Sequence, residues 1–254
     1  MTNDIRNTKV KSTAVMTDIR NFSGTFKDFQ NMDSDAFLGF IREYYNAMSD
    51  IAGIISDETW LHSIGDGIMT IFLDDENHKT GFAYTIVAHH IIKKMCEDFV
   101  NDNPGTILSF GIGADQGNVW KIDAGYLTTY VGTVINRASR IEASTKLFAH
   151  ATTAVGNSLY KKLLKDFYPS SYDIMKGYNS YDAILNKHPE AVLISKQFML
   201  QYVFDMPLKG IQKDAPIFRL SDSLASDKVK FWDVLEKLLP IEKVNKLHNY
   251  INNL

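Results

Sequence analysis

A tight polar turn between two apolar runs most constrains the fold of this chain. The turn, residues 63–67, has the sequence Ser-Ile-Gly-Asp-Gly and separates the apolar residues 51–61 from residues 68–73. Apolar runs of this length, rich in isoleucine and bounded by glycine and aspartate, are typical of strands. An Asp-Gly pair between two strands predicts a hairpin with the Asp66 carboxylate at its tip. Taken alone, such an aspartate is most often plain turn chemistry.

A second carboxylate follows another predicted strand. Residues 13–17 predict a short strand that ends at Asp18, ahead of a small-residue turn. If the two strands are neighbours, the Asp18 and Asp66 carboxylates converge, and the backbone carbonyl of Ile19 adds a third oxygen-bearing group. Oxygen ligands suit Mg²⁺ or Mn²⁺ and not zinc. The N–H groups at the start of the next expected helix are candidates for binding phosphate: Phe22, Ser23 and Gly24.

A third motif supplies polar groups of a different kind. Residues 132–143 predict a helix opened by glycine and threonine, with Asn136 and Arg140 four positions apart and hence on one face. An amide can orient a sugar, and a guanidinium can neutralise developing phosphate charge. On its own, such a pair usually belongs to a solvated helix face.

Together, and in this order and spacing, the three motifs resemble the catalytic domain of the class III nucleotide cyclases. They are D-I-R-N-F-S, S-I-G-D-G and G-x-x-x-N-R-A-S-R, and the resemblance extends over about residues 12–220. This family includes the adenylate and guanylate cyclases and the bacterial pyrimidine cyclases. The resemblance implies an α+β, ferredoxin-like fold with a central, mostly antiparallel sheet flanked by helices. It also implies a head-to-tail homodimer and catalysis by two Mn²⁺ or Mg²⁺ ions per site.

The resemblance assigns roles to individual residues. Asp18, Ile19 and Asp66 of one subunit would hold the metal ions, and Asn136 and Arg140 of the other would act on the substrate. A lysine before the glycine of the closing hairpin contacts the triphosphate, together with the amides of residues 22–24. That lysine is Lys209, with Lys213 as a nearby competitor. Some cyclases carry a further phosphate-binding arginine where this chain has Gly111.

The resemblance also points to the two residues that select the base, His62 and Thr129. Both side chains can donate or accept a hydrogen bond, so uracil, cytosine and adenine all remain open. His62 fits neither purine pattern, and no sensor domain is evident. We therefore expect conversion of UTP to cyclic UMP, a second messenger of antiviral defence that acts on a downstream effector. Cyclisation of CTP or ATP is the alternative. Trp60 and Tyr130, beside these positions, could narrow the pocket.

Two other function classes remain. One is a catalytically inactive module that senses nucleotide or pairs with an active partner, although the intact set of carboxylates, Asn136 and Arg140 argues against it. The other is a polymerase-like transferase. A net charge of −3 and a pI near 6.2 give no basic groove, which disfavours nucleic acid as a partner.

Composition and patterning suggest where such a chain works. No apolar run approaches the roughly 20 residues of a membrane span, and residues 1–11 lack the apolar segment of a signal peptide. The single cysteine, Cys96, excludes an intrachain disulfide. We expect a cytoplasmic protein.

The rest of the chain suggests three parts: an N-terminal extension (1–11), the catalytic domain (12–221) and a helical extension (222–254). Residues 107–114 and 119–122 predict two strands around a turn at 115–118, and residues 198–204 and 215–220 predict the closing hairpin. Residues 166–200 suggest a partly helical insertion. The amphipathic tail, interrupted by Pro240, predicts two helices that pack on the domain or on a partner.

Overall fold

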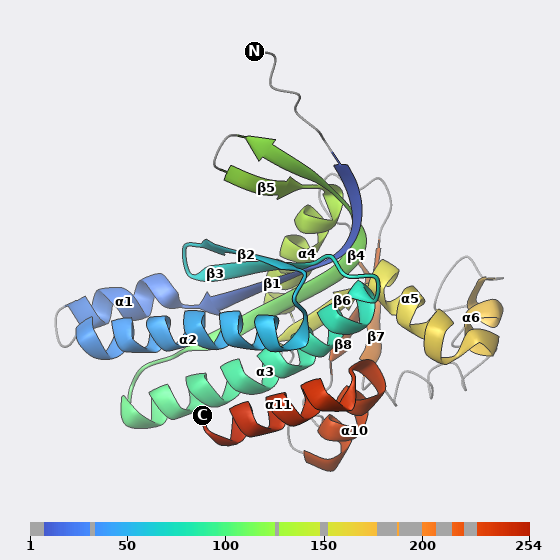
Figure 1. The fold of residues 1–254 in the computed structure, drawn as a ribbon. Helices are drawn as coiled ribbons and strands as arrows, with labels where there is room; N and C mark the ends of the chain where they lie inside the picture. Colours follow the sequence, from blue (N-terminus) through green and yellow to red (C-terminus); the bar gives the residue numbers. More distant parts are fainter. Residues whose placement is uncertain are drawn as a thin grey trace.

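The computed structural model describes residues 8–30, 34–124, 127–147, 152–176, 187, 200–206, 215–220 and 228–254. The strands are β1 (Thr8–Arg20), β2 (Thr59–Ile64), β3 (Gly67–Phe72), β4 (Ser109–Ala124), β5 (Leu127–Val131), β6 (Thr153–Gly156), β7 (Leu200–Met206) and β8 (Ala215–Leu220). They form one sheet in the order β2-β3-β1-β4-β6-β8-β7, with β5 paired to β4 (Figure 1). All pairs are antiparallel except β4 with β6. This is the α+β architecture expected from the sequence.

Helices cover both faces of the sheet. They are α1 (Phe22–Gln30), α2 (Ser34–Ile55), α3 (Asn77–Asp102), α4 (Thr133–Ser144), the short 3₁₀ helix η1 (Thr145–Leu147), α5 (Asn157–Phe167), α6 (Pro169–Lys176), α10 (Lys228–Leu238) and α11 (Ile241–Asn252). Helices α2 and α3 lie against one face, and α4 lies against the other (Figure 1). Among the described helices, none combines the length and apolar character that crossing a membrane requires.

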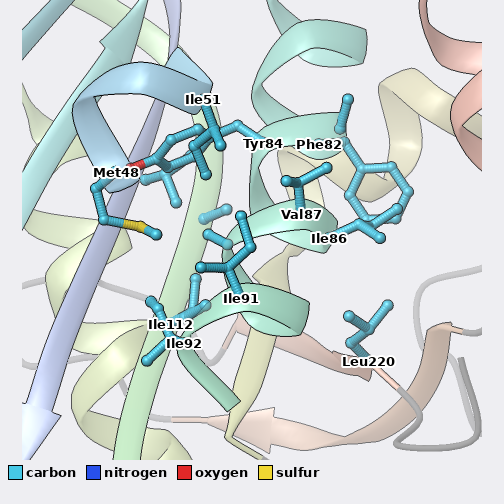
Figure 2. Packing of buried hydrophobic residues seen from close by; sticks show 14 of the residues in the cluster. Met48, Ile51, Phe82, Tyr84, Ile86, Val87, Ile91, Ile92, Ile112 and Leu220 are labelled. Atoms are coloured by element: carbon cyan, nitrogen blue, oxygen red, sulfur yellow. The ribbon is translucent and has the colours of Figure 1, made fainter. Parts of the chain in front are cut away.

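The alternation of β1 shows how the two faces differ. Val15 and Ile19 are fully buried in the main core beneath α2 and α3, whereas Ala14 belongs to a smaller apolar cluster on the α4 face. Figure 2 shows the main core, where Met48 and Ile51 of α2 meet the α3 side chains Tyr84 and Val87. Because side chains alternate along a strand, Asp18 faces the α4 side with Ala14.

The predicted hairpin is confirmed, with β2 and β3 antiparallel and Asp66 in the turn between them. Gly65 takes a positive φ of 61°, a conformation in which glycine meets no steric penalty. The closing hairpin is also confirmed, as β7 and β8. Within the region 166–200, α5 ends at Phe167 and α6 follows it; residues 177–186 and 188–199 lie outside the described part of the chain.

The predicted turn at residues 115–118 is wrong. These residues lie inside the single long strand β4, and Asp115 pairs with Ala14 of β1. Polar residues are stable inside the strand because they have hydrogen-bond partners. Asp115 accepts hydrogen bonds from Arg137 and two backbone amides, and Gln116 donates to Asn77. Buried polar groups satisfied in this way need no turn to bring them to solvent.

The C-terminal tail forms two helices that meet at Pro240, as predicted, and they pack on the helices of this same chain. Helix α10 contacts α3, and α11 contacts α2; Figure 1 shows both on the side of the sheet that α3 covers. The Lys243 ammonium donates to the Ile55 carbonyl at 2.7 Å, and the Tyr250 hydroxyl donates to Asp50 at 3.1 Å. The sheet also takes in residues 8–11, which pair with β4.

Candidate active site

Two glycines flank Asp18 on the neighbouring strands. In the sheet register Asp18 lies opposite Gly67 of β3 on one side and Gly111 of β4 on the other. A Cβ added at Gly67 would lie 3.4 Å from the Asp18 carboxylate and only 2.9 Å from the Thr17 carbonyl oxygen. Asp66 precedes Gly67 directly, so the hairpin brings the second carboxylate beside the first.

A backbone hydrogen bond ties β1 to this turn. The Ile19 N–H donates to the Asp66 carbonyl at 3.3 Å. The N–H and C=O of one strand residue point toward the same neighbour, so the Ile19 carbonyl also faces the β2–β3 turn. Two carboxylates and one carbonyl therefore converge, and this all-oxygen set fits Mg²⁺ or Mn²⁺. In the described ranges, no three side chains among His, Cys, Asp and Glu gather closely enough to ligate one metal ion.

Burial and neighbouring acids raise the pKa of two carboxyl groups near the end of β1. Burial and the neighbouring Asp66 carboxylate raise the pKa of Asp18, although Lys146 and Arg20 oppose the rise. Burial, together with Asp18, raises the pKa of Glu142 on α4 to about 7. Clustered carboxylates repel one another, and a bound cation would relieve that repulsion.

Sequence reasoning missed Glu142 and Arg20, although each lies inside a motif that it singled out. Arg20 is the third residue of D-I-R-N-F-S, and Glu142 ends the turn of helix after Arg140. The Arg20 guanidinium donates to Thr145 of η1. Only the three-dimensional structure shows that both side chains lie next to the same residue, Gly111 of β4.

The start of α1 lies immediately after β1, as expected. Asn21 takes a positive φ of 62° and joins β1 to the helix, whose first residues are Phe22, Ser23 and Gly24. The Asn21 side chain donates to the Ile107 carbonyl at 2.8 Å, and its amide oxygen lies 2.7 Å from where a Gly24 Cβ would be. First-turn N–H groups have no partner within a helix, so this end can accept an anion.

Helix α4 carries Asn136 and Arg140 on the side that faces away from the sheet. Val134, Ala138 and Ile141 are buried against β1 and β4, whereas Asn136 is exposed and Arg140 half-buried. None of the hydrogen bonds or ion pairs among the described residues joins Asn136 or Arg140 to Asp18 or Asp66. One chain thus brings the two aspartates together but does not bring the α4 pair to them.

The predicted base-selecting residues occupy β2 and β5. The His62 ring stacks on Trp60 at a centroid distance of 5.3 Å, and Trp60 meets Tyr130 edge-on at 5.4 Å. Neighbouring residues on a strand point to opposite faces, so the contact of Tyr130 with Trp60 turns the adjacent Thr129 away from this cluster. Within one chain, Tyr130 and not Thr129 shares the aromatic cluster with His62.

Lys209 and Lys213 lie outside the described residues. A cavity of about 620 Å³ lies far from the aspartates, between α2, α3 and α11. It mixes apolar side chains with carboxylates and holds none of the candidate site residues. Asp18 lies instead on the face of the sheet that α4 covers.

Comparison with solved structures shows the same architecture in nucleotide cyclases. The adenylyl cyclase CyaB from P. aeruginosa matches with a TM-score of 0.63 and 18% identity, over 86% of this chain and 97% of that chain. This chain has the class III nucleotide cyclase fold. A bacterial light-regulated adenylyl cyclase matches with a TM-score of 0.60 and 14% identity, over 95% of this chain and 58% of the other. The guanylyl cyclase Cya2 matches with a TM-score of 0.54 and 16% identity, over 84% and 93%.

The likeness is one of structure and not of sequence. No protein-family model matches the chain, and none of the curated protein sequences is detectably similar to it. At identities of 14 to 18% the comparison bears on the fold alone.

Proposed function

We propose that this chain is a nucleotide cyclase, which converts a nucleoside triphosphate to a 3′,5′-cyclic nucleotide and pyrophosphate. The observation that carries the proposal is the convergence of the Asp18 and Asp66 carboxylates with the Ile19 carbonyl at the end of β1. The same three oxygen-bearing groups are the metal-binding set that the cyclase resemblance implies, and the fold is that of adenylyl and guanylyl cyclases.

Each group has a chemical task in this reaction. Asp18, Asp66 and Ile19 would hold two Mg²⁺ or Mn²⁺ ions, which when bound would lower the pKa of the ribose 3′-hydroxyl and neutralise charge on the leaving pyrophosphate. Asn136 would orient the ribose, because an intramolecular attack on the α-phosphorus depends on alignment. Arg140 would stabilise the charge that accumulates on the α-phosphate. The first amides of α1, with Lys209, would hold the remaining phosphates.

The active form in this proposal is a homodimer with shared sites. Asn136 and Arg140 face away from the sheet that carries Asp18, so a second copy is needed to complete each site. Exposed apolar side chains on β4 and β5 support such an association: Trp120 is 44% exposed and Val131 45%.

For the base, we favour uracil, with cyclic UMP as the product and an antiviral effector as its target. The aromatic cluster of Trp60, His62 and Tyr130 leaves His62 as the polar group beside a flat stacking surface, which suits a single-ring base. Cytosine comes next, and ATP is the alternative. A cytoplasmic location and the division into residues 1–11, 12–221 and 222–254 belong to the same proposal.

One experiment separates these possibilities. The purified chain is given each of the four ribonucleoside triphosphates with Mn²⁺, and the products are resolved by chromatography. We expect a cyclic nucleotide, with UTP preferred, and no product from Asp18→Asn or Asp66→Asn under the same conditions.

The outcomes are distinct. A preference for ATP would overturn the choice of base and leave the cyclase proposal intact. No product from any nucleotide, while nucleotide still binds, would favour the inactive sensing or partner module.

A further inference from the structure

A third acidic side chain lies near Asp18, on the side of that residue away from Asp66. Glu142 of α4 is 5% exposed, and its Oε1 occupies the space that a side chain at Gly111 would fill. Gly111 is the register partner of Asp18. Glu142 therefore approaches Asp18 over a glycine, on the flank away from Asp66.

Arg20 and Lys146 lie near this carboxylate and oppose the rise in its pKa, but neither forms an ion pair with it among the described residues. Glu142 Oε1 is buried without a hydrogen-bond partner, and none of the ion pairs found among the described residues includes Glu142. The nearest guanidinium is that of Arg20, whose Nη2 lies 2.8 Å from the position of the absent Gly111 Cβ. That group donates to Thr145, and the Arg20 Nε is itself buried without a partner.

A buried carboxylate without a partner is costly, and a fold retains one where another charge completes the site. Backbone packing holds Glu142 in place, since a Cβ at Gly113 would overlap the Ala138 carbonyl and the Glu142 amide nitrogen. This close approach brings the start of the Glu142 side chain next to β4. The position of the Glu142 carboxylate and its missing hydrogen-bond partner both point to a cation beside Asp18.

We propose that Glu142 is a third carboxylate of the metal centre, which binds the divalent ion through water and raises its affinity. Binding is through water because three side chains do not lie close enough here to ligate one ion. Outer partners of this kind typically change metal affinity by about 10- to 100-fold. The inference rests on the proposed role of Asp18 and Asp66, and its test keeps the two apart.

The test is Mn²⁺ binding to the full chain without nucleotide, measured by the electron paramagnetic resonance signal of free Mn²⁺. Glu142→Gln keeps the shape and removes the charge, so we expect the dissociation constant to rise about tenfold or more. Glu43→Gln, an exposed change on α2, is the matched control and should leave binding unchanged. Unfolding midpoints with and without Mn²⁺ give a second readout.

Glu142→Gln should unfold no earlier than the wild type in metal-free buffer, and Mn²⁺ should stabilise it less. Binding within twofold of the wild type, or a variant that does not fold, overturns the proposal, because the carboxylate would then be structural. If Asp66→Asn abolishes binding and Glu142→Gln does not, only this inference fails. If Asp66→Asn leaves binding intact, or the wild type binds no Mn²⁺, the two-aspartate centre fails as well.

Discussion

Arg137 shows how a single residue can anchor helix α4 to the sheet. It lies beside Asn136 on α4, and its Nε donates to the buried Asp115 carboxylate at 2.5 Å while a second nitrogen donates to the Gln116 carbonyl. Burial raises the pKa of Asp115 although Arg137 opposes the rise, so the carboxylate depends on its partner. We expect Arg137→Met to lower the free energy of unfolding by about 3 kcal/mol, because Asp115 would stay buried and unpaired. Lys121→Met, which breaks an exposed pair with Asp123 on the same strand, should cost less than about 1 kcal/mol. Urea denaturation measures both, and equal losses would contradict this account.

At the scale of elements, one glycine of β4, Gly113, decides how closely α4 approaches the sheet. A Cβ at Gly113 would meet backbone atoms of α4 that cannot rotate away. Gly113→Ala should therefore push the helix outward and cost about 3 kcal/mol, the upper range for overpacking. Gly39→Ala on α2 is the control: nothing lies within 4 Å of its added Cβ, and a helical alanine should stabilise by about 0.5 to 1 kcal/mol. The two midpoints in a denaturant titration should move in opposite directions. A neutral Gly113→Ala would show that α4 is not held by this contact.

At the scale of the whole molecule, we predict that two subunits share each active site. Asp66→Ala and Arg140→Ala should each be inactive as pure proteins. If sites are shared between chains, mixing them should restore about a quarter of wild-type activity, since half of the dimers are mixed and each has one complete site of two. Mixing Asp66→Ala with Asp18→Ala should restore none, because both changes affect the same side of the site. Subunit exchange is checked with two affinity tags. Exchange without recovery in the first mixture would rule out shared sites.

Much of the fold could be predicted from local sequence. The hairpin at Asp66 follows from glycine and aspartate between apolar runs, because those residues suit a tight turn whatever lies around them. The amphipathic tail and its break at Pro240 are equally local, since they depend on helical periodicity and on the missing proline N–H. The convergence of Asp18 and Asp66 required one assumption, that their strands are neighbours, and the register of β1 with β3 bears this out.

The rest was decided by contacts between distant residues. A turn at residues 115–118 was predicted because polar residues interrupt an apolar run, yet Asp115 stays within β4 because Arg137 and the Leu159 amide, far away in sequence, satisfy it. No local pattern distinguishes Glu142 from an exposed helical glutamate; its burial depends on Gly111 and Gly113 on another element. Sequence by itself determined which residues can form strands, turns and an oxygen-rich site. Tertiary structure alone decided which charges are buried together, because burial and pairing depend on the packing of whole elements.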